Sequence, residues 1–332
     1  MTIPPIPLRM STALLAVIAM IVVAIGTGTA IGVVTRPVPT EPPASPTPLP
    51  TVTPEPDTEP LVFKQPLAAG CATDDAVFVV SNGGGVGRFD GQKWQLIDST
   101  LRSLVSAGCG SDLMQAVGPF GRLLTIDDQA KTIQADDLGL FDAYAISILP
   151  DGALVVGSEG SVQRETSAGW QPYAKGIEED LFGVVGFASG AAWAVGSQGV
   201  TYRLEPAGWR PFETGTKATL RTIAASSPTD ALTAGDGGVL LRFDGHWLPL
   251  DSGVTRDLRS SVRLGAITYV VGDGGTALAV EGVAVRSINL NTTCAIRDVF
   301  TKRDEVWFVG SEGTHAGVWR MRGEQIVRWG TC

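Results

Sequence analysis

The chain is poor in the residues that most often bind transition metals. Its 332 residues include two histidines and four cysteines, and no Cys-x-x-Cys pair occurs. Structural zinc sites take four cysteine or histidine ligands at short spacings. The sequence therefore predicts no metal site, and nothing in it indicates a cofactor.

Positive charge is also scarce. Lysine and arginine together number 25 against 34 aspartates and glutamates, which gives a formal net charge of −9. Binding to nucleic acid depends on the neutralisation of phosphates by basic side chains. We therefore exclude nucleic acid as a partner.

Helical periodicity is missing from the region after residue 60, and a short repeat takes its place. Its clearest copy reads Ala-Ala-Trp-Ala-Val-Gly-Ser-Gln-Gly-Val-Thr-Tyr-Arg at residues 191–203. The second glycine of the Gly-x-x-Gly motif recurs seven times, at intervals of 37 to 39 residues: Gly84, Gly121, Gly160, Gly199, Gly238, Gly275 and Gly313. A period near 40 with alternating large apolar residues, such as Trp193 and Val195, is typical of four-stranded propeller blades. The sequence predicts an all-β fold, a seven-bladed β-propeller of four-stranded blades over residues 61–332.

The residues between the two glycines of each motif are turn formers. Some are acidic, among them Asp236, Asp273, Glu159 and Glu312. A calcium site needs several oxygen ligands that converge within one loop. We interpret these acids as turn residues and not as cation ligands.

The N-terminus contains an apolar run without charge at residues 11–34. A helix of this length spans a bilayer. We predict residues 1–10 as a cytoplasmic N-terminus, residues 11–34 as an uncleaved signal anchor and single transmembrane helix, and the propeller on the extracytoplasmic side of the cell membrane. The alternative is a signal peptide that is cleaved near residues 28–30, which would release a secreted protein.

Residues 35–60 form the predicted linker between this helix and the propeller. Ten prolines fall within residues 37–60. Proline removes the backbone donor that a ladder needs and favours extended polyproline II. We expect a disordered, stiff spacer with neither helix nor strand.

The four cysteines follow the repeat period. Cys71 and Cys109 are 38 residues apart, as are Cys294 and Cys332. Residues one period apart occupy equivalent places in neighbouring blades, so we predict the disulfides Cys71–Cys109 and Cys294–Cys332. The alternative joins the first and last blades through Cys71–Cys332; four cysteines allow three connectivities. Either arrangement fits an oxidising compartment.

Arginine recurs just before the predicted first strand of four repeats, after leucine or isoleucine. The four residues are Arg102, Arg221, Arg259 and Arg297, which precede the second glycine of their motifs by 19, 17, 16 and 16 residues. The first strand of a blade is the innermost, so we expect these arginines near the axis, as a basic patch that binds carboxylates of a partner. In the alternative interpretation each arginine pairs with a neighbouring acid such as Asp257 or Asp298.

The motifs resemble those of a known family. Ala-Trp-Ala-Val-Gly-Ser-Gln-Gly at 192–199, Val-Trp-Phe-Val-Gly-Ser-Glu-Gly at 306–313 and Arg-Phe-Asp-Gly-x-x-Trp at 88–94 are similar to the repeats of bacterial BNR-like propellers, most of all the photosystem II stability/assembly-factor type. The full Asp-Gly-Gly-x-Thr-Trp box of that family is never present here. The resemblance implies a non-enzymatic protein that binds partners during assembly of membrane complexes, with arginines on one propeller face.

These observations leave two main classes of function. The first is a membrane-tethered binding module or assembly scaffold, whose membrane-associated protein partner is held through an acidic segment. The second is a glycan hydrolase of sialidase type, which needs a tyrosine and acids beside an arginine cluster; a ligand-sensing or adhesion propeller is a further alternative. Convergence of tyrosine and acids with the arginines in one axial pocket would favour the hydrolase. We predict no catalytic residues and expect the scaffold.

Overall fold

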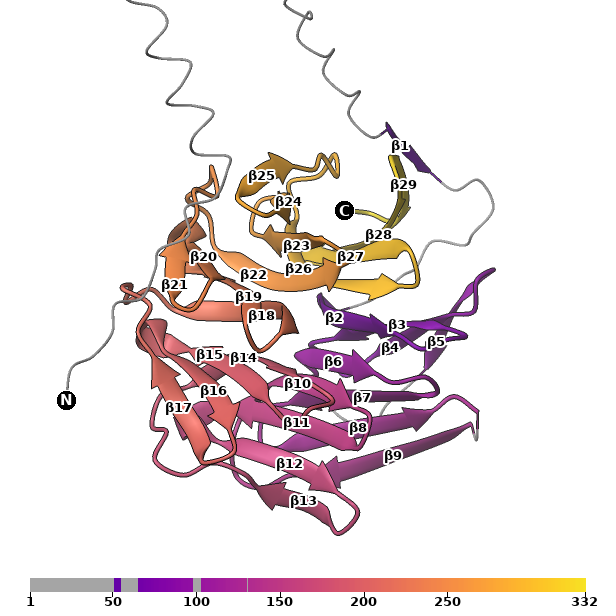
Figure 1. Cartoon of the computed structure of the whole chain (residues 1–332). Coiled ribbons are helices and arrows are strands. Elements are labelled where there is room, and N and C mark those ends of the chain that lie inside the picture. The colour runs from indigo at the N-terminus through magenta and orange to yellow at the C-terminus, as the bar shows by residue number, and fades with distance from the viewer. Residues whose placement is uncertain (1–50, 55–64, 98–102, 130) are drawn as a thin grey trace, which may run out of the picture. The chain divides into compact units, whose positions relative to one another are not determined.

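The computed structural model describes residues 51–54, 65–97, 103–129 and 131–332, and these form seven sheets. Six sheets have four strands, each antiparallel to the next, and the last has five. Every four-stranded unit runs in sequence order from the innermost strand outward (Figure 1). This confirms the predicted seven-bladed β-propeller of four-stranded blades.

Blades 1 to 4 comprise the following strands. Blade 1 has β2 (Leu67–Ala72), β3 (Val77–Ser81), β4 (Val86–Phe89) and β5 (Trp94–Ile97). Blade 2 has β6 (Ser106–Cys109), β7 (Leu113–Gly118), β8 (Arg122–Asp127) and β9 (Thr132–Asp137). Blade 3 has β10 (Ala143–Leu149), β11 (Gly152–Gly157), β12 (Val162–Thr166) and β13 (Gly169–Pro172). Blade 4 has β14 (Leu181–Gly186), β15 (Ala192–Gly196), β16 (Thr201–Glu205) and β17 (Gly208–Phe212).

Blades 5 to 7 follow the same plan. Blade 5 has β18 (Leu220–Ser227), β19 (Asp230–Gly235), β20 (Leu240–Phe243) and β21 (Trp247–Pro249). Blade 6 has β22 (Leu258–Leu264), β23 (Ile267–Gly272), β24 (Ala277–Glu281) and β25 (Ala284–Ser287). Blade 7 has β26 (Ala295–Lys302), β27 (Glu305–Glu312), β28 (His315–Arg322) and β29 (Gln325–Gly330). Single 3₁₀ turns follow the second strand in blades 3 to 5: η1 (Ser158–Gly160), η2 (Ser197–Gly199) and η3 (Asp236–Gly238).

The first strands of the seven blades close a ring. Each contacts the first strand of the blade on either side, and β26 of blade 7 contacts β2 of blade 1. Side chains reinforce this last junction: the Ser311 hydroxyl donates to the Leu67 carbonyl at 2.9 Å, and the Lys302 ammonium donates to the Thr73 carbonyl at 2.9 Å. The ring therefore surrounds a central axis, and the starts of the first strands meet around it.

The second strands build the core between blades. The large residues predicted to alternate there are buried, as Trp193 and Trp307 show with exposed fractions of 0% and 1%. Gln115, the polar exception in blade 2, is also buried, and its amide nitrogen lies 3.4 Å from the Glu165 carboxylate of blade 3. The alternation of apolar residues thus marks the inter-blade packing surface.

The fifth strand of the last sheet comes from the proline-rich segment. β1 (Thr51–Pro54) pairs in parallel with β29, from Thr51 opposite Gln325 to Pro54 opposite Arg328. A proline is tolerated here because β1 is the edge of the sheet. The expectation that this segment forms no strand is wrong for these four residues. The rest of the predicted linker (35–50 and 55–60), the predicted transmembrane helix at 11–34 and residues 1–10 lie outside the described residues.

No helix in the part of the chain that the structure describes is long and apolar enough to cross a bilayer.

Two disulfides reinforce the ring. Cys71 of β2 pairs with Cys109 of β6, with Cα atoms 5.5 Å apart, and so joins blades 1 and 2. Cys294, just before β26, pairs with Cys332, just after β29, with Cα atoms 5.9 Å apart. The pairing is the predicted one, but the expectation that each bond joins neighbouring blades is wrong for the second, which joins the two ends of blade 7.

Candidate functional site

A β-bulge near the start of the first strand positions one side chain per blade at the axis. In six blades the pairing register with the second strand shifts at one residue near the start of the first strand, and in blade 5 it shifts again between Ala225 and Ser227. A bulge residue is left out of the ladder, and its side chain is aimed away from the sheet. In blade 2 the equivalent residue is Val105, whose amide donates to the Val117 carbonyl at 2.8 Å. We call the seven residues the bulge ring: Ala68, Val105, Tyr144, Phe182, Arg221, Arg259 and Arg297.

The local sequence explains why the bulge falls at this residue. The preceding residue is fully buried, as Leu220 and Leu258 show. It pairs with the first glycine of the Gly-x-x-Gly motif, for example Leu220 with Gly235. A Cβ on Gly235 would lie 1.9 Å from the Thr219 carbonyl oxygen, so only glycine permits this approach. In the Leu-Arg motif, therefore, the leucine is the buried residue that pairs with the motif glycine, and the arginine is the ring residue.

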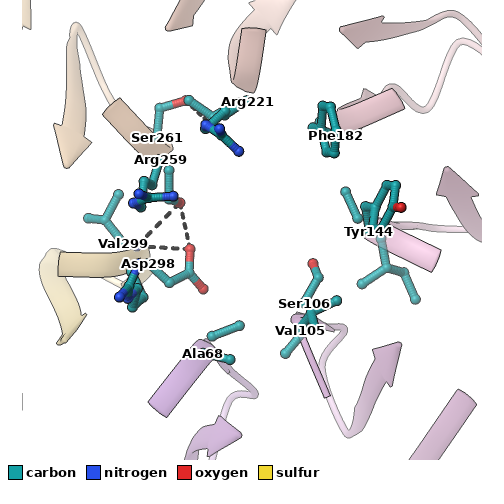
Figure 2. A pocket seen from close by; sticks show the side chains of 18 of the residues that line it. Ala68, Val105, Ser106, Tyr144, Phe182, Arg221, Arg259, Ser261, Asp298 and Val299 are labelled. Atoms are coloured by element: carbon teal, nitrogen blue, oxygen red, sulfur yellow. Dashed lines mark hydrogen bonds between the residues drawn. The ribbon is translucent and has the colours of Figure 1, made fainter. Parts of the chain in front are cut away.

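All seven ring residues line one axial cavity of about 250 Å³. Figure 2 shows Ala68, Val105, Tyr144, Phe182, Arg221 and Arg259 around the same opening. The arginines belong to consecutive blades 5, 6 and 7, and the aromatic residues to blades 3 and 4. The opening, which we call the mouth, thus has a basic side and an aromatic side.

Two of the three arginines are held by acids from the turns of their own blades. The Arg221 guanidinium binds both oxygens of Asp236 through Nε and Nη2. Arg259 binds Asp273 in the same manner, at 2.5 and 2.6 Å, and its Nη2 also lies 3.7 Å from Asp257. This hydrogen bonding raises the pKa of Arg259 and lowers the pKa of Asp273. Asp236 and Asp273 therefore hold the ring arginines in addition to forming the turns, a role that the sequence interpretation missed.

The third arginine lacks such a partner. Blade 7 has Ser311 where blades 5 and 6 have Asp236 and Asp273. Among the carboxylates that the structure describes, the one within ion-pair distance of Arg297 Nη1 is Asp273 of blade 6, at 3.8 Å. Burial and then the neighbouring positive charge of Arg259 lower the pKa of Arg297, and the charges of Asp273 and Glu312 offset this only in part. Arg297 is thus the ring arginine with the least compensated charge.

Free donors remain on the basic side. Arg221 and Arg259 use Nε and Nη2 for their aspartates, and among the described residues no hydrogen bond reaches Nη1 of either. Together with Arg297 they present guanidinium N–H groups to the mouth. An anion such as a carboxylate would satisfy these donors.

The aromatic side is a contiguous stack. The Tyr144 and Phe182 rings lie 5.0 Å apart with an interplanar angle of 25°. The Arg221 guanidinium carbon lies 5.8 Å from the Phe182 ring centroid, within the range of a cation–π contact. Burial, followed by the charges of Asp180 and Asp142, raises the pKa of Tyr144. The tyrosine is therefore neutral at pH 7, and the stack continues to the basic side.

Asp298 lies beside Arg297 in β26 but points to a different set of groups. Its Oδ1 accepts from the Ser260 hydroxyl at 2.5 Å and the Val299 amide at 2.9 Å, and its Oδ2 accepts from the Gly70 amide at 2.8 Å. These bonds join the first strands of blades 6, 7 and 1. Burial raises the pKa of Asp298 to about 6. Its role is to join blades at the ring closure.

A second set of aspartates fixes the turns around the mouth. Asp142, Asp180 and Asp257 each accept a backbone N–H from the turn of the preceding blade, at 2.9, 2.9 and 3.0 Å. Each lies two residues before a ring residue, as Asp257 does before Arg259. The spacing Asp-x-ring residue is a signal that sequence reasoning could have used.

The predicted arginine set is brought together in part. Arg221, Arg259 and Arg297 share the mouth, and Arg102 lies outside the described residues. The ring position of its blade belongs to Val105, which precedes Gly121 by 16 residues, as Arg259 precedes Gly275. The alternative pairing with Asp298 is absent among the described groups, and Asp257 is a secondary partner of Arg259.

Fold and mouth define a class of protein: a seven-bladed β-propeller with mixed basic and aromatic side chains at one end of its axis. Solved structures share this fold. A structure of YCF48 bound to D1 peptide has 15% sequence identity and a TM-score of 0.63, covering 77% of this chain and 92% of that one. YCF48 from Cyanidioschyzon merolae has 16% identity and a TM-score of 0.63, over 80% and 98% of the two chains.

A WD40 propeller is similar to the same degree. The β-propeller domain of Doa1 has 13% identity and a TM-score of 0.66, over 78% of this chain and 94% of that one. No protein-family model matches this sequence, and no curated protein matches it. The similarity to YCF48 and to WD40 propellers is thus one of fold.

Proposed function

We propose that this protein is a membrane-tethered, extracytoplasmic binding module without enzymatic activity, which acts as an assembly scaffold for a membrane-associated complex. The partner presents a carboxylate to the mouth, where Arg297 takes it. The tether is the apolar segment at residues 11–34. The described fold is shared with solved β-propellers, and one of these structures, that of YCF48, is a complex with a peptide.

One observation carries this proposal. Three consecutive blades place arginine at the bulge, but only two of them supply an aspartate from their own turn. A site built only for stability would complete the third pair. The 38% exposure of the Arg297 side chain shows that solvent, and hence a ligand, reaches it.

The proposal is tested by crosslinking the full-length protein in its native membranes, followed by affinity recovery. Arg297→Glu reverses the charge at the mouth, and Arg286→Glu makes the same change on β25, where the side chain is exposed and pairs with Glu281 at 3.6 Å. We expect Arg297→Glu to lower recovery of a specific partner at least tenfold and Arg286→Glu to leave it unchanged. Equal recovery with both variants would refute a role of the mouth.

A second candidate, the sialidase-type hydrolase, has one observation in its favour. Tyr144, Asp298 and the three arginines line the same cavity. The details do not suit the chemistry, because Tyr144 has a raised pKa and both oxygens of Asp298 are engaged by neighbouring donors. A fluorogenic sialoside distinguishes the two: hydrolysis that Tyr144→Phe abolishes would establish the enzyme.

A further inference from the structure

An exposed phenylalanine stands next to the mouth in an unfavourable backbone conformation. Phe120 lies in the turn after β7, is 70% exposed and has φ of 60°. The equivalent left-handed residues in blades 3, 4 and 5 are Glu159, Gln198 and Gly237. A bulky residue in this region is strained, and its exposure leaves apolar surface in water. Neither cost is offset by a contact that buries the ring.

A second exposed apolar residue comes from the neighbouring loop. Leu140 is fully exposed and is followed by the half-buried Phe141. The two loops touch: a Cβ on Gly121 would lie 2.1 Å from the Gly139 carbonyl oxygen, and the Leu138 amide donates to the Gly121 carbonyl at 2.7 Å. Phe120 and Leu140 each flank this contact. We call Phe120, Leu140 and Phe141 the apolar rim.

A hydrogen bond links the rim to the segment that carries a ring residue. The Phe120 amide donates to the Asp142 carboxylate at 2.9 Å, and Asp142 lies two residues before Tyr144. Tyr144 stacks on Phe182, and Phe182 lies under Arg221. The rim therefore borders Asp142, which precedes the Tyr144–Phe182 stack, and this stack meets Arg221 of the basic side.

We propose that the mouth and the apolar rim form one docking surface for an extended segment of a partner protein. An acidic side chain of this segment lies at Arg297, and a large apolar side chain further along it lies on Phe120 and Leu140. The inference rests on the proposed function. It adds that the ligand carries both an acidic and a large apolar side chain, and that it runs from Arg297 to the apolar rim. Aromatic and aliphatic anchors beside a charged contact are the usual composition of an interface centre.

A protein segment fits this surface better than an anionic bilayer does. Membrane attraction requires a surplus of basic residues. Here the arginines of the mouth are bordered by Asp236, Asp257 and Asp273. One further carboxylate satisfies the guanidinium donors that these aspartates leave free, and the cavity of about 250 Å³ admits a side chain.

The test is a selection of random 12-residue peptides, displayed on phage, against the full-length protein in detergent micelles. We expect enrichment of peptides that combine aspartate or glutamate with an aromatic or large aliphatic residue at a fixed spacing. Selection against Phe120→Ser/Leu140→Ser should retain the acid and lose the apolar residue. Selection against Arg297→Gln should do the reverse.

Affinity of a synthetic consensus peptide, measured by fluorescence anisotropy, gives the magnitude. We expect Phe120→Ser/Leu140→Ser and Arg297→Gln each to weaken binding by roughly tenfold or more. Val283→Ser, a matched change of an exposed apolar residue in the turn between β24 and β25, should alter it less than about twofold. Circular dichroism confirms that each variant is folded.

Three results would overturn the inference: no enriched consensus, a consensus without one of the two elements, or unchanged affinity in the rim variant. Binding to phosphatidylglycerol vesicles that depends on Phe120 and Leu140, and that the peptide does not displace, would assign the rim to lipid instead. If Arg297→Glu abolishes partner recovery from membranes and the rim variant does not, the proposed function stands and this inference fails.

Discussion

Arg297 shares the Asp273 carboxylate with another arginine. Its Nη1 lies 3.8 Å from Asp273 Oδ1, the oxygen that already accepts from Arg259 at 2.5 Å. Among the described carboxylates, blade 6 thus supplies the one within ion-pair distance of this arginine of blade 7. The arrangement leaves the basic side of the mouth with more donors than acceptors, and this imbalance can be altered at one residue.

Replacement of that shared acid should strengthen ligand binding. Asp273→Asn removes the negative charge that competes with a bound carboxylate, so we expect recovery of the acidic partner to rise about fivefold, equivalent to roughly 1 kcal/mol. The free energy of unfolding should fall by about 1 kcal/mol, because the ion pair is one-third exposed. Asp304→Asn, which breaks an exposed pair with Arg322, is the control and should change neither quantity. Weaker partner recovery in Asp273→Asn would contradict the model of a donor surplus.

Asp298 should make the stability depend on pH. Its pKa is about 6 in the folded protein, above the ordinary 3.8 that it regains on unfolding. The folded state therefore binds the proton more tightly, and this contribution to the free energy of unfolding is fully present below pH 3.8 and is lost as pH rises through 6. The loss is up to about 3 kcal/mol for a shift of this size.

Urea titrations between pH 4 and 7 measure this effect. Wild type should lose stability with rising pH, and Asp298→Asn should have a flatter profile whatever its absolute stability. The carboxyl of Asp128, whose pKa the Arg88 guanidinium lowers, acts in the opposite direction but at lower pH. Parallel profiles for wild type and Asp298→Asn would show that another group titrates.

The two disulfides should contribute to stability to a similar extent. Each closes a loop of 38 residues, for which the lost entropy of the unfolded chain corresponds to about 4 kcal/mol. We expect Cys71→Ser/Cys109→Ser and Cys294→Ser/Cys332→Ser each to lower the free energy of unfolding by roughly this amount. Reduced wild type should be less stable than either double variant. Peptide mapping under non-reducing conditions checks the pairing, and a Cys71–Cys332 peptide would contradict it.

Relief of the strain at Phe120 should stabilise the propeller. Glycine adopts positive φ without penalty, so Phe120→Gly should raise the free energy of unfolding by about 1 kcal/mol. Phe120→Ala keeps the Cβ atom and with it the strain, and we expect little gain. Thermal unfolding of wild type, Phe120→Gly and Phe120→Ala measures these differences in stability. A loss of stability in Phe120→Gly would mean that the phenyl ring packs against the fold.

The blades could be predicted from the sequence because their signals are local. The recurring glycines permit a close backbone approach, as Gly235 does at the Thr219 carbonyl, and the alternating residues such as Trp193 face the neighbouring blade. The glycine recurs in six of the seven blades, with Ser81 in its place in blade 1, and the alternation recurs with Gln115 as its exception. The period therefore survives even where a single repeat, such as that of Gln115, departs from the pattern.

The mouth could be predicted only in part. The shared residue type indicates Arg221, Arg259 and Arg297, but it does not indicate Tyr144 and Phe182, which occupy the same position in other blades. The bulge was hidden for a physical reason: an extra residue in a strand breaks the alternation by which strands are recognised. The bond from Arg259 to Asp273 was equally hidden, because the aspartate by itself is explained by its turn.

The bulge also bears on how such a protein changes its ligand. The side chain of a ring residue faces the axis and lies outside the paired register of the strands, so its replacement leaves the strand register intact. Ala68 and Val105 are small and occupy the same position as the arginines. Single substitutions there would add new recognition groups while the scaffold stays as it is, which makes the ring a natural route for divergence among propellers and a practical one for design.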